Sequence, residues 1–367
     1  MSHSSHHLPA WSWAGPLAAT LLLGAKFAGL VSADSALLLC AVGVLLGVTV
    51  FAAVHHAELL AVRAGEPFGS ILLAIAVTVI EVALILSIML ASPAGTEALA
   101  RDTVFSAVMI VLNGVVGLCL VVGGRRHYEQ TFQIKGASAA LAVLGTLATL
   151  ALVLPNYTTT TVGPFYAPSQ LLFVGAVSLI LYFIFVFVQT VRHRAYFLDE
   201  ADDEIGEEGP PVAPPRTGLV IASALLLIVS LVGVVLLAKI LSYPLDRAVA
   251  AAGLPQTVVG IVIAAVVLLP EGIAALKAAA LNRLQSSINL ALGSAIASIG
   301  LTIPAVAVAS LLLGTKLSLG LSPDSLVLLV LTLFVSTLTL GTGRTTILQG
   351  AIHLVIFAVF LLFAAVP

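Results

Sequence analysis

Charged residues are scarce in this chain. Only 9% of its 367 residues are Asp, Glu, Lys or Arg, whereas 60% are hydrophobic and the mean hydropathy is +1.18. A soluble domain carries about 25% charged residues, so no water-soluble packing could hide this much apolar surface. The apolar runs are long and continuous, which favours helices over a β-barrel. The composition predicts an all-α, polytopic membrane protein.

Cysteine is nearly absent, and neither sign of charge is in large excess. Cys40 and Cys119 lie in apolar stretches, where they are interpreted as small packing residues and not as a disulfide or metal pair. The formal net charge of −2 gives no indication of nucleic-acid binding. No G-x-x-x-x-G-K-[ST] motif is present, so neither ATP nor any cofactor is expected. The expected partners are inorganic cations, protons and membrane lipid, and a homo-oligomer is compatible with this class.

About eleven transmembrane helices are predicted, each close to the roughly 20 residues that a hydrocarbon core about 30 Å thick requires. A polar cluster, Gly341 to Arg344, separates the last two. The eleven helices are expected at residues 14–32, 36–56, 68–92, 103–123, 137–154, 169–191, 218–241, 256–279, 287–312, 323–342 and 346–366. The preceding tail, residues 1–13, has no signal-peptide pattern. We expect it to be disordered, with metal binding by His3, His6 and His7 as the alternative.

The positive charges indicate the orientation. Ten of the fifteen Lys and Arg residues fall on one side of these spans and five on the other. Because cytoplasmic loops are enriched in Lys and Arg, this bias gives the expected orientation of a multi-pass protein. Its N-terminus is expected in the cytoplasm and its C-terminus outside.

One acidic segment divides the spans into two groups of five. Residues 192–217 contain seven of the seventeen acidic residues, between Asp199 and Glu208, followed by Pro and Gly. We interpret them as a solvated cytoplasmic linker, with a loose cation sensor as the alternative. The predicted organisation is an extra helix at 14–33, a first repeat at 34–191 and a second at 218–367. Since five is odd, the second repeat crosses the membrane in the opposite direction to the first.

Two glutamates occupy matching places in these halves, near the middle of the second span of each. Glu81 lies in ILLAIAVTVIEVALILSIML and Glu271 in TVVGIVIAAVVLLPEGIAALKAAA. A carboxylate near the bilayer centre costs roughly 2.5–3.5 kcal/mol even on the lenient insertion scale, so such residues usually serve a function. Paired midplane acids in inverted repeats are typical of a transporter's ion site.

Polar side chains nearby supply further candidate ligands. Pro270 removes a backbone hydrogen bond beside Glu271 and can expose a carbonyl oxygen. The other candidate lining residues are Thr78, Ser106, Asn113, Asn289, Ser294 and Ser298. Small-residue stripes in the same spans are equally typical of helix packing. His55, His56 and His353 are candidates for pH sensing, with interfacial anchoring of the first two and packing of the third as the alternatives.

These residue types fit a hard cation. Two carboxylates match the charge of one divalent ion, and Ca²⁺ takes six to eight oxygen ligands. No thiolate or imidazole cluster favours a soft metal. Carboxylates removed from water also bind protons more readily, so a cation and protons would compete for the same oxygens. Competition at one alternating-access site is sufficient for exchange.

The chain resembles the bacterial calcium/proton antiporters that also carry sodium and potassium, in the cation/Ca²⁺ exchanger superfamily. The resemblance is carried by HAELLAVRAGEPFGSILLAIAVTVIEVALI (56–85), RDTVFSAVMIVLNGVVGLCLVVGGRRH (101–127), the acidic linker, LLPEGIAALKAAALNRLQSSINLALGSAIASIGLTIP (268–304) and STLTLGTGRTTILQGAIHL (336–354).

This resemblance implies inverted five-helix repeats with an extra first helix, and Glu81 and Glu271 as the acids of the two repeats. It also implies a location in the bacterial inner (plasma) membrane. In the superfamily signature Gly-Asn-Ala-x-Glu, Thr78 and Leu268 stand where the Asn would be. That departure implies a changed ligand set, weaker selectivity for calcium and a greater expectation of monovalent-ion transport.

The function predicted from the sequence is secondary antiport, not enzyme catalysis. The chain is expected to export Ca²⁺, or Na⁺ or K⁺, in exchange for H⁺, with Glu81 and Glu271 binding cation or protons in turn. The alternatives are a monovalent cation/proton or sodium-driven exchanger and, more distantly, an ion channel. An intramembrane hydrolase is disfavoured because the spans contain no pair of aspartates and His353 has no evident serine partner.

Overall fold

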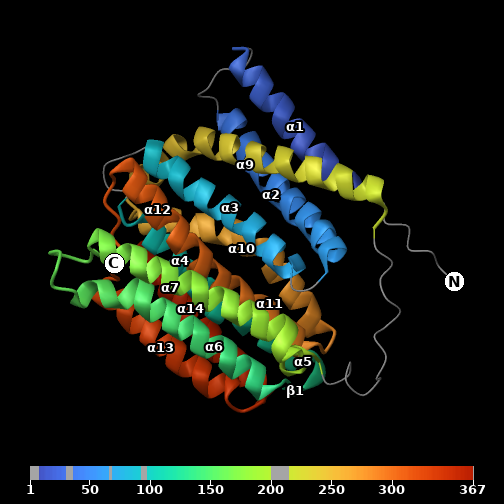
Figure 1. The fold of residues 1–367 in the computed structure, drawn as a ribbon, viewed down its shortest axis with the longest axis vertical. Helices are drawn as coiled ribbons and strands as arrows, with labels where there is room; N and C mark the ends of the chain where they lie inside the picture. Colours follow the sequence, from blue (N-terminus) through green and yellow to red (C-terminus); the bar gives the residue numbers. More distant parts are fainter. Residues whose placement is uncertain (1–7, 30–35, 66–67, 92–96, 200–214, 367) are drawn as a thin grey trace. The chain divides into compact units, whose positions relative to one another are not determined.

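The computed structural model describes residues 8–29, 36–65, 68–91, 97–199 and 215–366 (Figure 1). Its α-helices are α1 (Ala10–Phe27), α2 (Ala36–Ala64), α3 (Phe68–Ala91), α4 (Leu99–Met109), α5 (Val116–His127), α6 (Ile134–Ala148), α7 (Pro168–Phe187), α9 (Thr217–Ala251), α10 (Thr257–Ala280), α11 (Leu284–Ala297), α12 (Ile303–Leu313), α13 (Pro323–Leu340) and α14 (Ile347–Ala365).

Several of these helices join through segments of other helical types. The π-helical segments are η1 (Ile110–Val115), η2 (Thr149–Val153), η4 (Val188–Arg192) and η6 (Ser298–Thr302), and the 3₁₀ segments are η3 (Leu154–Tyr157) and η5 (Arg194–Phe197). Thus α4, η1 and α5 form one long helix, as do α11, η6 and α12. Two short strands, β1 (Gln130–Thr131) and β2 (Arg344–Thr345), pair antiparallel.

Ten helices within the described residues are long and apolar enough to cross a membrane, and each overlaps one predicted span, although α2 and α9 extend 8 and 10 residues past the predicted ends at 56 and 241. The all-α, multi-pass membrane architecture is thereby confirmed. The predicted first span, 14–32, corresponds to α1, which begins and ends earlier than expected and is not among the ten. Its 18 residues include two tryptophans, Pro16 and Lys26, which lower the hydropathy of this short helix.

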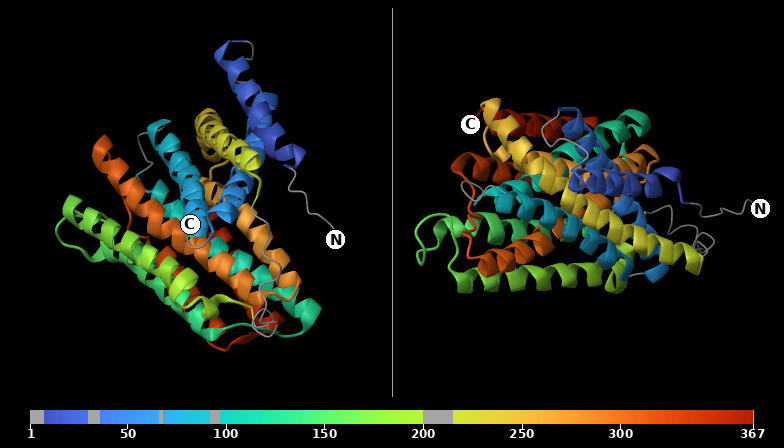
Figure 2. Two further views of the ribbon diagram at one scale, coloured as in Figure 1. Left: turned by 45° about the vertical axis from the view of Figure 1, so that its right-hand side comes forward. Right: turned by 90° about the horizontal axis from the view of Figure 1, so that it is seen from above.

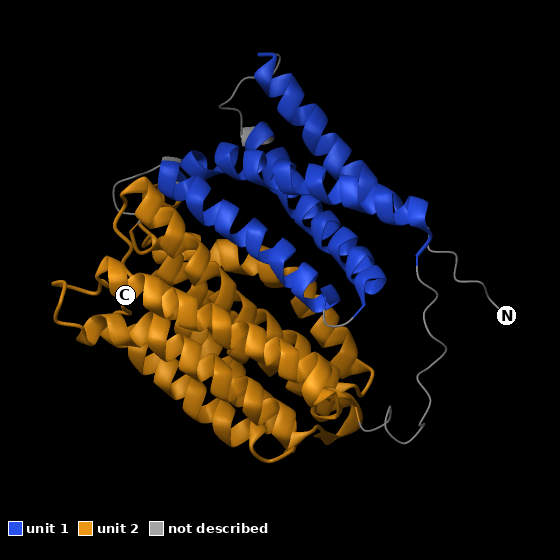
Figure 3. Ribbon diagram, in the orientation of Figure 1, with its two compact units in different colours: residues 1–92, 211–248 blue, residues 93–210, 249–367 orange. Residues whose placement is uncertain are grey.

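The chain packs as two compact units (Figure 3). Unit 1 comprises residues 1–92 and 211–248, and unit 2 comprises residues 93–210 and 249–367. In unit 1, α2 packs against both α1 and α3. These units are defined by packing and the predicted repeats by chain order, so the repeat boundaries stay a prediction.

The long helices of unit 2 lie side by side as a bundle (Figure 2). One end of the bundle, called here the strand end, carries β1 and β2. There Gln130 Nε2 donates to the carbonyl oxygen of Ala279 at 3.0 Å, and the backbone N–H of Gln133 donates to Gln285 Oε1 at 2.7 Å. The ends of α5 and α10 therefore meet the start of α11.

The opposite end of unit 2, called here the cavity end, joins the starts of α4, α10 and α13. Arg101 donates to the carbonyl oxygen of Gly320 at 3.0 Å, and the Thr257 hydroxyl lies 3.3 Å from Asp102 Oδ2. Thus α4, α10 and α13 run from the cavity end toward the strand end. The helices α11–α12 and α14 run in the opposite direction.

Part of the predicted linker is folded onto the strand end. Asp199 is buried, accepts a hydrogen bond from the Ser286 hydroxyl and lies 3.4 Å from Arg283 Nε. Asn289 Nδ2 donates to the carbonyl oxygen of Phe197, just before it. Residues 194–199 therefore dock on the start of α11, because that turn supplies partners for their polar groups. The acidic stretch from residue 200 to 208 lies outside the described residues, and with it the alternative of a cation sensor.

Candidate functional site

The helix that carries Glu271 lies along α4 and η1. A methyl group on Gly260 would lie 2.9 Å from the backbone of Asp102, and one on Gly272 would lie 3.3 Å from Val115 Cγ2. Twelve residues along α10, from Gly260 to Gly272, thus match thirteen along α4 and η1, from Asp102 to Val115, so the two helices run parallel in close contact. Glycine at both contacts permits this approach. Glu271 is consequently held at the level of η1.

The surroundings of Glu271 combine burial with an altered backbone. Its Oε2 atom is shielded from solvent, although the residue as a whole is only half-buried. Pro270 lies inside α10, which continues helically through it. Proline has no N–H to donate, so the carbonyl of Val266, four residues earlier, loses its usual helical partner. A carboxylate and a carbonyl oxygen one turn away are both ligands that a hard cation accepts.

The second predicted acid belongs to the other unit. Glu81 lies in α3 of unit 1 and is 2% exposed, and Thr78, one turn before it, is also buried. Charged residues almost never become this buried without partners or a function. The two acids lie in different units, so their approach to a common ion stays a prediction.

Asn113 stands at the middle of η1 with its amide directed to α13 and α14. Its Nδ2 donates to Thr332 Oγ1 at 2.9 Å, and its Oδ1 lies 3.1 Å from His353 Nδ1. On the other side of the ring, His353 Nε2 lies 3.1 Å from Thr339 Oγ1. All four side chains are buried. The amide that the sequence offered as a cation ligand is thus engaged in a network between three helices.

The partners of His353 define its tautomer. Since the Asn113 oxygen can only accept, Nδ1 carries the ring proton and donates it to that oxygen. Nε2 of the neutral ring then accepts from the Thr339 hydroxyl. Thr332 in turn directs its hydroxyl to Met109 Sδ at 3.4 Å. This hydrogen-bonded setting agrees with the packing role considered for His353, and its role in pH sensing stays a prediction.

The other candidate ligands differ in how they are occupied. Ser106 is fully buried on α4, and its hydroxyl has no hydrogen-bond partner among the described residues. Asn289 is occupied on both sides, because it accepts from Gln285 at 2.8 Å and donates to the carbonyl oxygen of Phe197. Ser298 is buried at the start of η6, and Ser294, one turn earlier, is half-buried. Their roles as ligands stay predictions.

The two helices that carry most of these residues share an irregularity. Both contain a π-helical segment near mid-length, η1 in one and η6 in the other, and they run in opposite directions. A π segment inserts an extra residue into a helical turn and is frequent at functional sites. Matching irregularities in antiparallel helices are the relation that inverted repeats would produce.

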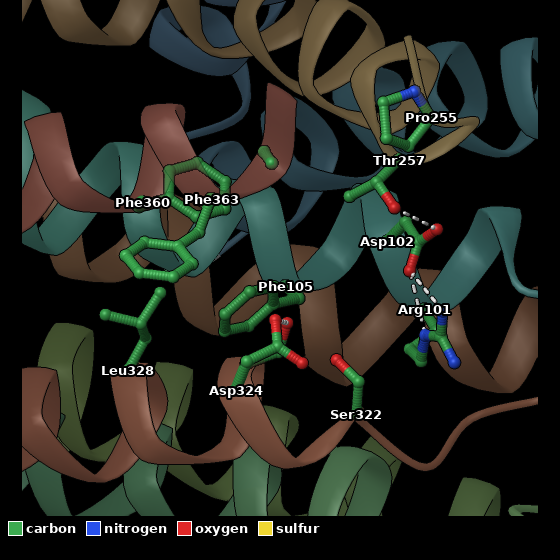
Figure 4. Close-up of a pocket in the computed structure, with 12 residues that line it drawn as sticks. Arg101, Asp102, Phe105, Pro255, Thr257, Ser322, Asp324, Leu328, Phe360 and Phe363 are labelled. Carbon is green, nitrogen blue, oxygen red and sulfur yellow. Dashed lines mark hydrogen bonds and ion pairs between the residues drawn. The ribbon is translucent and has the colours of Figure 1, made fainter. Parts of the chain in front are cut away.

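A cavity of about 230 Å³ opens at the cavity end of unit 2 (Figure 4). Its polar wall contains Asp102, buried and 2.7 Å from an Arg101 nitrogen, and the exposed Asp324. Phe105, Leu328, Phe360 and Phe363 form the apolar wall. The residues above Asp102 on one face of α4, at successive turns, are Ser106, Met109 and Asn113. The cavity therefore marks the solvent-facing end of the helix face that leads to η1.

The predicted pH-sensing pair lies in unit 1. His56 is fully buried, and its Nε2 lies 2.9 Å from the carbonyl oxygen of Ser12. The His55 ring contacts that of Trp11, with 5.2 Å between centroids. Both histidines of α2 thus contact α1, and their roles in pH sensing and in interfacial anchoring stay predictions.

Sequence reasoning missed several of these residues. Thr332 and Met109 belong to the buried network but carry no signal beyond an isolated polar or soft side chain in an apolar span. Asp102 and Asp324 each occupy the first turn of a helix, where acids are common for electrostatic reasons alone. Thr339, near the end of α13, also belongs to the network through its contact with His353 of α14.

Known proteins resemble this chain over most of its length. The family described as sodium/calcium exchanger protein matches residues 35–191 and 222–366. The Sinorhizobium fredii protein y4hA, named as a candidate ionic transporter, is 58% identical over 364 residues, which are 99% of this chain and 98% of that protein. The sodium-potassium/proton antiporter ChaA of Escherichia coli is 34% identical over 224 residues, 59% of this chain and 58% of ChaA.

Solved structures share the fold. YfkE aligns with a TM-score of 0.71 at 18% identity, covering 97% of this chain and 100% of YfkE. The H⁺/Ca²⁺ exchanger CAX aligns with a TM-score of 0.67 at 16% identity, covering 96% of this chain and 88% of CAX. Together with the match to the family over both halves of the sequence, these similarities establish that the chain is a multi-pass membrane carrier belonging to the sodium/calcium exchanger protein family.

Proposed function

We propose that this protein is a secondary antiporter that exports Ca²⁺ in exchange for H⁺. Glu271 carries the proposal, because it sits on a proline-altered helix at the level of η1 in a chain of the exchanger family. Glu81 is its counterpart from the first half. Each would bind cation and proton in turn, since a pair of neighbouring carboxylates cannot bind the metal ion and a full set of protons at the same time.

A second candidate cargo is Na⁺ or K⁺. It is supported by the similarity to ChaA, which is named a sodium-potassium/proton antiporter. The residues agree, since Thr78 and Leu268 replace the amide of the superfamily signature and so leave fewer oxygens for calcium. YfkE, in contrast, is named a Ca²⁺/H⁺ antiporter, and calcium therefore stays the first candidate for the transported ion.

The proposed orientation places the strand end in the cytoplasm of a bacterium and the cavity end outside its inner membrane. Of the ten Lys and Arg residues in unit 2, all described, two lie toward the cavity end, Arg101 and Lys316, and the other eight lie toward the strand end. This asymmetry is the one that the positive-inside rule expects. The end of α14, at the cavity end, would then place the C-terminus outside.

Transport into everted membrane vesicles tests the proposal. With an imposed proton gradient, addition of Ca²⁺, Na⁺ or K⁺ should release protons from the vesicle interior, and the order of effective concentrations identifies the cargo. Glu271→Gln and Glu81→Gln should each abolish exchange. The matched control is Glu129→Gln, since Glu129 is an exposed glutamate at the strand end. Full exchange by either acidic-site variant would overturn the mechanism.

A further inference from the structure

The π segment beside Glu271 needs support from outside its own helix. A π turn is wider than an α turn and has poorer packing of its own backbone, so it persists where neighbouring groups stabilise it. In η1 the backbone N–H of Val116 bonds to the carbonyl of Val111, the five-residue spacing of such a turn. Asn113 lies in the middle of that turn.

On one face, η1 is fixed by α13 and α14. Asn113 bonds both Thr332 and His353, and a methyl group on the adjacent Gly114 would lie 3.3 Å from the Phe357 ring. Every polar atom of the Asn113 amide that faces these helices is thus engaged at 2.9–3.1 Å. Rotation of η1 about its axis would break both bonds at once.

On the opposing face, η1 meets the helix of Glu271. A methyl group on Gly272, the residue next to that acid, would lie 3.3 Å from Val115 Cγ2, so the two backbones are close here. Residues 113 and 115 are separated by about 200° around a helix, so the network and the α10 contact lie on nearly opposite sides. The same turn therefore links a buried hydrogen-bond network to the segment that presents Glu271.

We propose that Asn113 and His353 are positioning residues that set the register of η1 against Glu271 and thereby set the affinity of the transported cation. This inference rests on the proposed function, since it assigns the network to the same site. Neither residue contacts the cation. His353 acts through Asn113, and Asn113 acts through the backbone of η1.

A proton relay through His353 is the competing interpretation. Among the described residues, the hydrogen bonds of this network end at the Met109 sulfur on one side and at Thr339 on the other. The thioether of Met109 cannot pass a proton on, and the Thr339 hydroxyl, which could, bonds no further side chain among the described residues. The hydrogen-bond network therefore ends within these helices, as expected if it holds η1 in position. A proton relay would need further hydrogen-bonded groups beyond these two ends.

The experiment measures the cation KM and the maximal rate of purified protein in proteoliposomes, over a range of pH. Asn113→Leu and His353→Leu should each raise KM about tenfold or more, because a shift of about 1 Å in a binding group has effects of that size. The double variant should be no worse than the poorer single variant, since both substitutions break one network. His353→Gln, which can donate to Asn113 and accept from Thr339, should restore KM to within about threefold with an unchanged pH profile.

The control is Thr103→Val. Thr103 is a fully buried threonine on α4 whose hydroxyl, among the described residues, bonds the carbonyl of Leu99 in its own helix, at 2.8 Å. Its KM should equal that of the unmodified protein. Thr332→Val, which hardly changes the side-chain volume, removes the other hydrogen bond of Asn113 and can be used if the leucine variants fail to fold. It should also raise KM.

Hydrogen–deuterium exchange of the backbone amides of residues 110–116 gives a readout independent of transport. Exchange should be faster in His353→Leu and normal in His353→Gln. If the unmodified protein moves no cation, the proposed function fails while this measurement still decides the positioning role. An unchanged KM and unchanged exchange in His353→Leu would overturn the inference, and a His353→Gln variant that binds cation normally but loses proton coupling would establish the relay instead.

Discussion

The buried carboxylate of Asp102 in unit 2 is paired with one cation, Arg101. Asp102 is 6% exposed, and Arg101 both pairs with it at 2.7 Å and bonds the carbonyl of Gly320. A buried ion pair adds little stability compared with apolar residues, but removing one member leaves an uncompensated charge. Arg101 is therefore expected to contribute to the stability of the folded protein, independently of any function of the neighbouring cavity.

We expect Arg101→Ala to destabilise the protein by about 3 kcal/mol, because the Asp102 carboxylate would stay buried without its cation. Thermal unfolding of the detergent-solubilised protein measures this loss. Arg344→Ala is the matched control, since the Arg344–Glu129 pair is exposed, with 70% and 48% of the side chains accessible, and such pairs contribute at most about 1 kcal/mol. Equal losses in the two variants would contradict the explanation.

Tyr166 offers a test of burial outside the spans. Its hydroxyl donates to the carbonyl of Leu150 at 2.6 Å, and burial raises its pKa to about 12. The unfolded chain ionises a tyrosine near pH 10, so this group favours the folded state below that pH, and its contribution is lost as pH rises from about 10 toward 12. The tyrosinate absorbance of the folded protein, minus that of Tyr166→Phe, should titrate near pH 12. A difference titration near pH 10 would show that Tyr166 is solvated.

At the scale of helices, close contact between α10 and α4 depends on glycine. Gly260 meets the backbone of Asp102 and Thr103, which cannot move aside as a flexible side chain can. Contact through small residues is the main way that helices associate closely inside a membrane. The position of Glu271 beside η1 is thus determined a dozen residues away as well as locally.

Gly260→Ala should separate the two helices and lower both stability and transport. Overpacking of this kind typically costs about 1–3 kcal/mol. Gly293→Ala on α11 is the control, because a methyl group there would meet no atom within 4 Å and alanine favours the helix by up to about 1 kcal/mol. Unfolding temperature and exchange rate are measured for both. A Gly260→Ala variant as stable as the control would argue against tight contact.

The helices themselves could be predicted from the sequence, because apolar runs bounded by residues such as Pro323 and Gly341 reveal membrane spans directly. The π segments could not, because one extra residue in a turn leaves the hydrophobic pattern unchanged. A buried amide such as that of Asn113 needs a hydrogen-bond partner, but the sequence does not identify it, because Thr332 is 219 residues away in sequence. The docking of Asp199 was missed because its neighbours in sequence indicated only a solvated acidic segment.

For the whole molecule, the direction of insertion determines which ions meet which end. The two ends of unit 2 differ in charge, with the arginines concentrated at the strand end. Antiport needs defined sides, since the proton gradient acts from one of them.

Cysteine labelling tests the orientation. In a variant without Cys40 and Cys119, which are both free thiols, Lys316→Cys should react with a membrane-impermeant reagent in intact cells, because Lys316 is exposed at the cavity end. Glu129→Cys, exposed at the strand end, should react only after the cells are opened. The reverse pattern would invert the proposed topology.

Unit 1 is assembled from two stretches of chain, residues 1–92 and 211–248, with residues 93–210 of unit 2 between them. During biosynthesis the ribosome delivers α1, α2 and α3 to the membrane well before α9. The early helices must therefore wait in lipid for their last partner. Insertion factors that bind incompletely assembled helices would be needed longest at this stage. A translational pause after α3 would lengthen this delay, so it would be tolerated less well than a pause after α9.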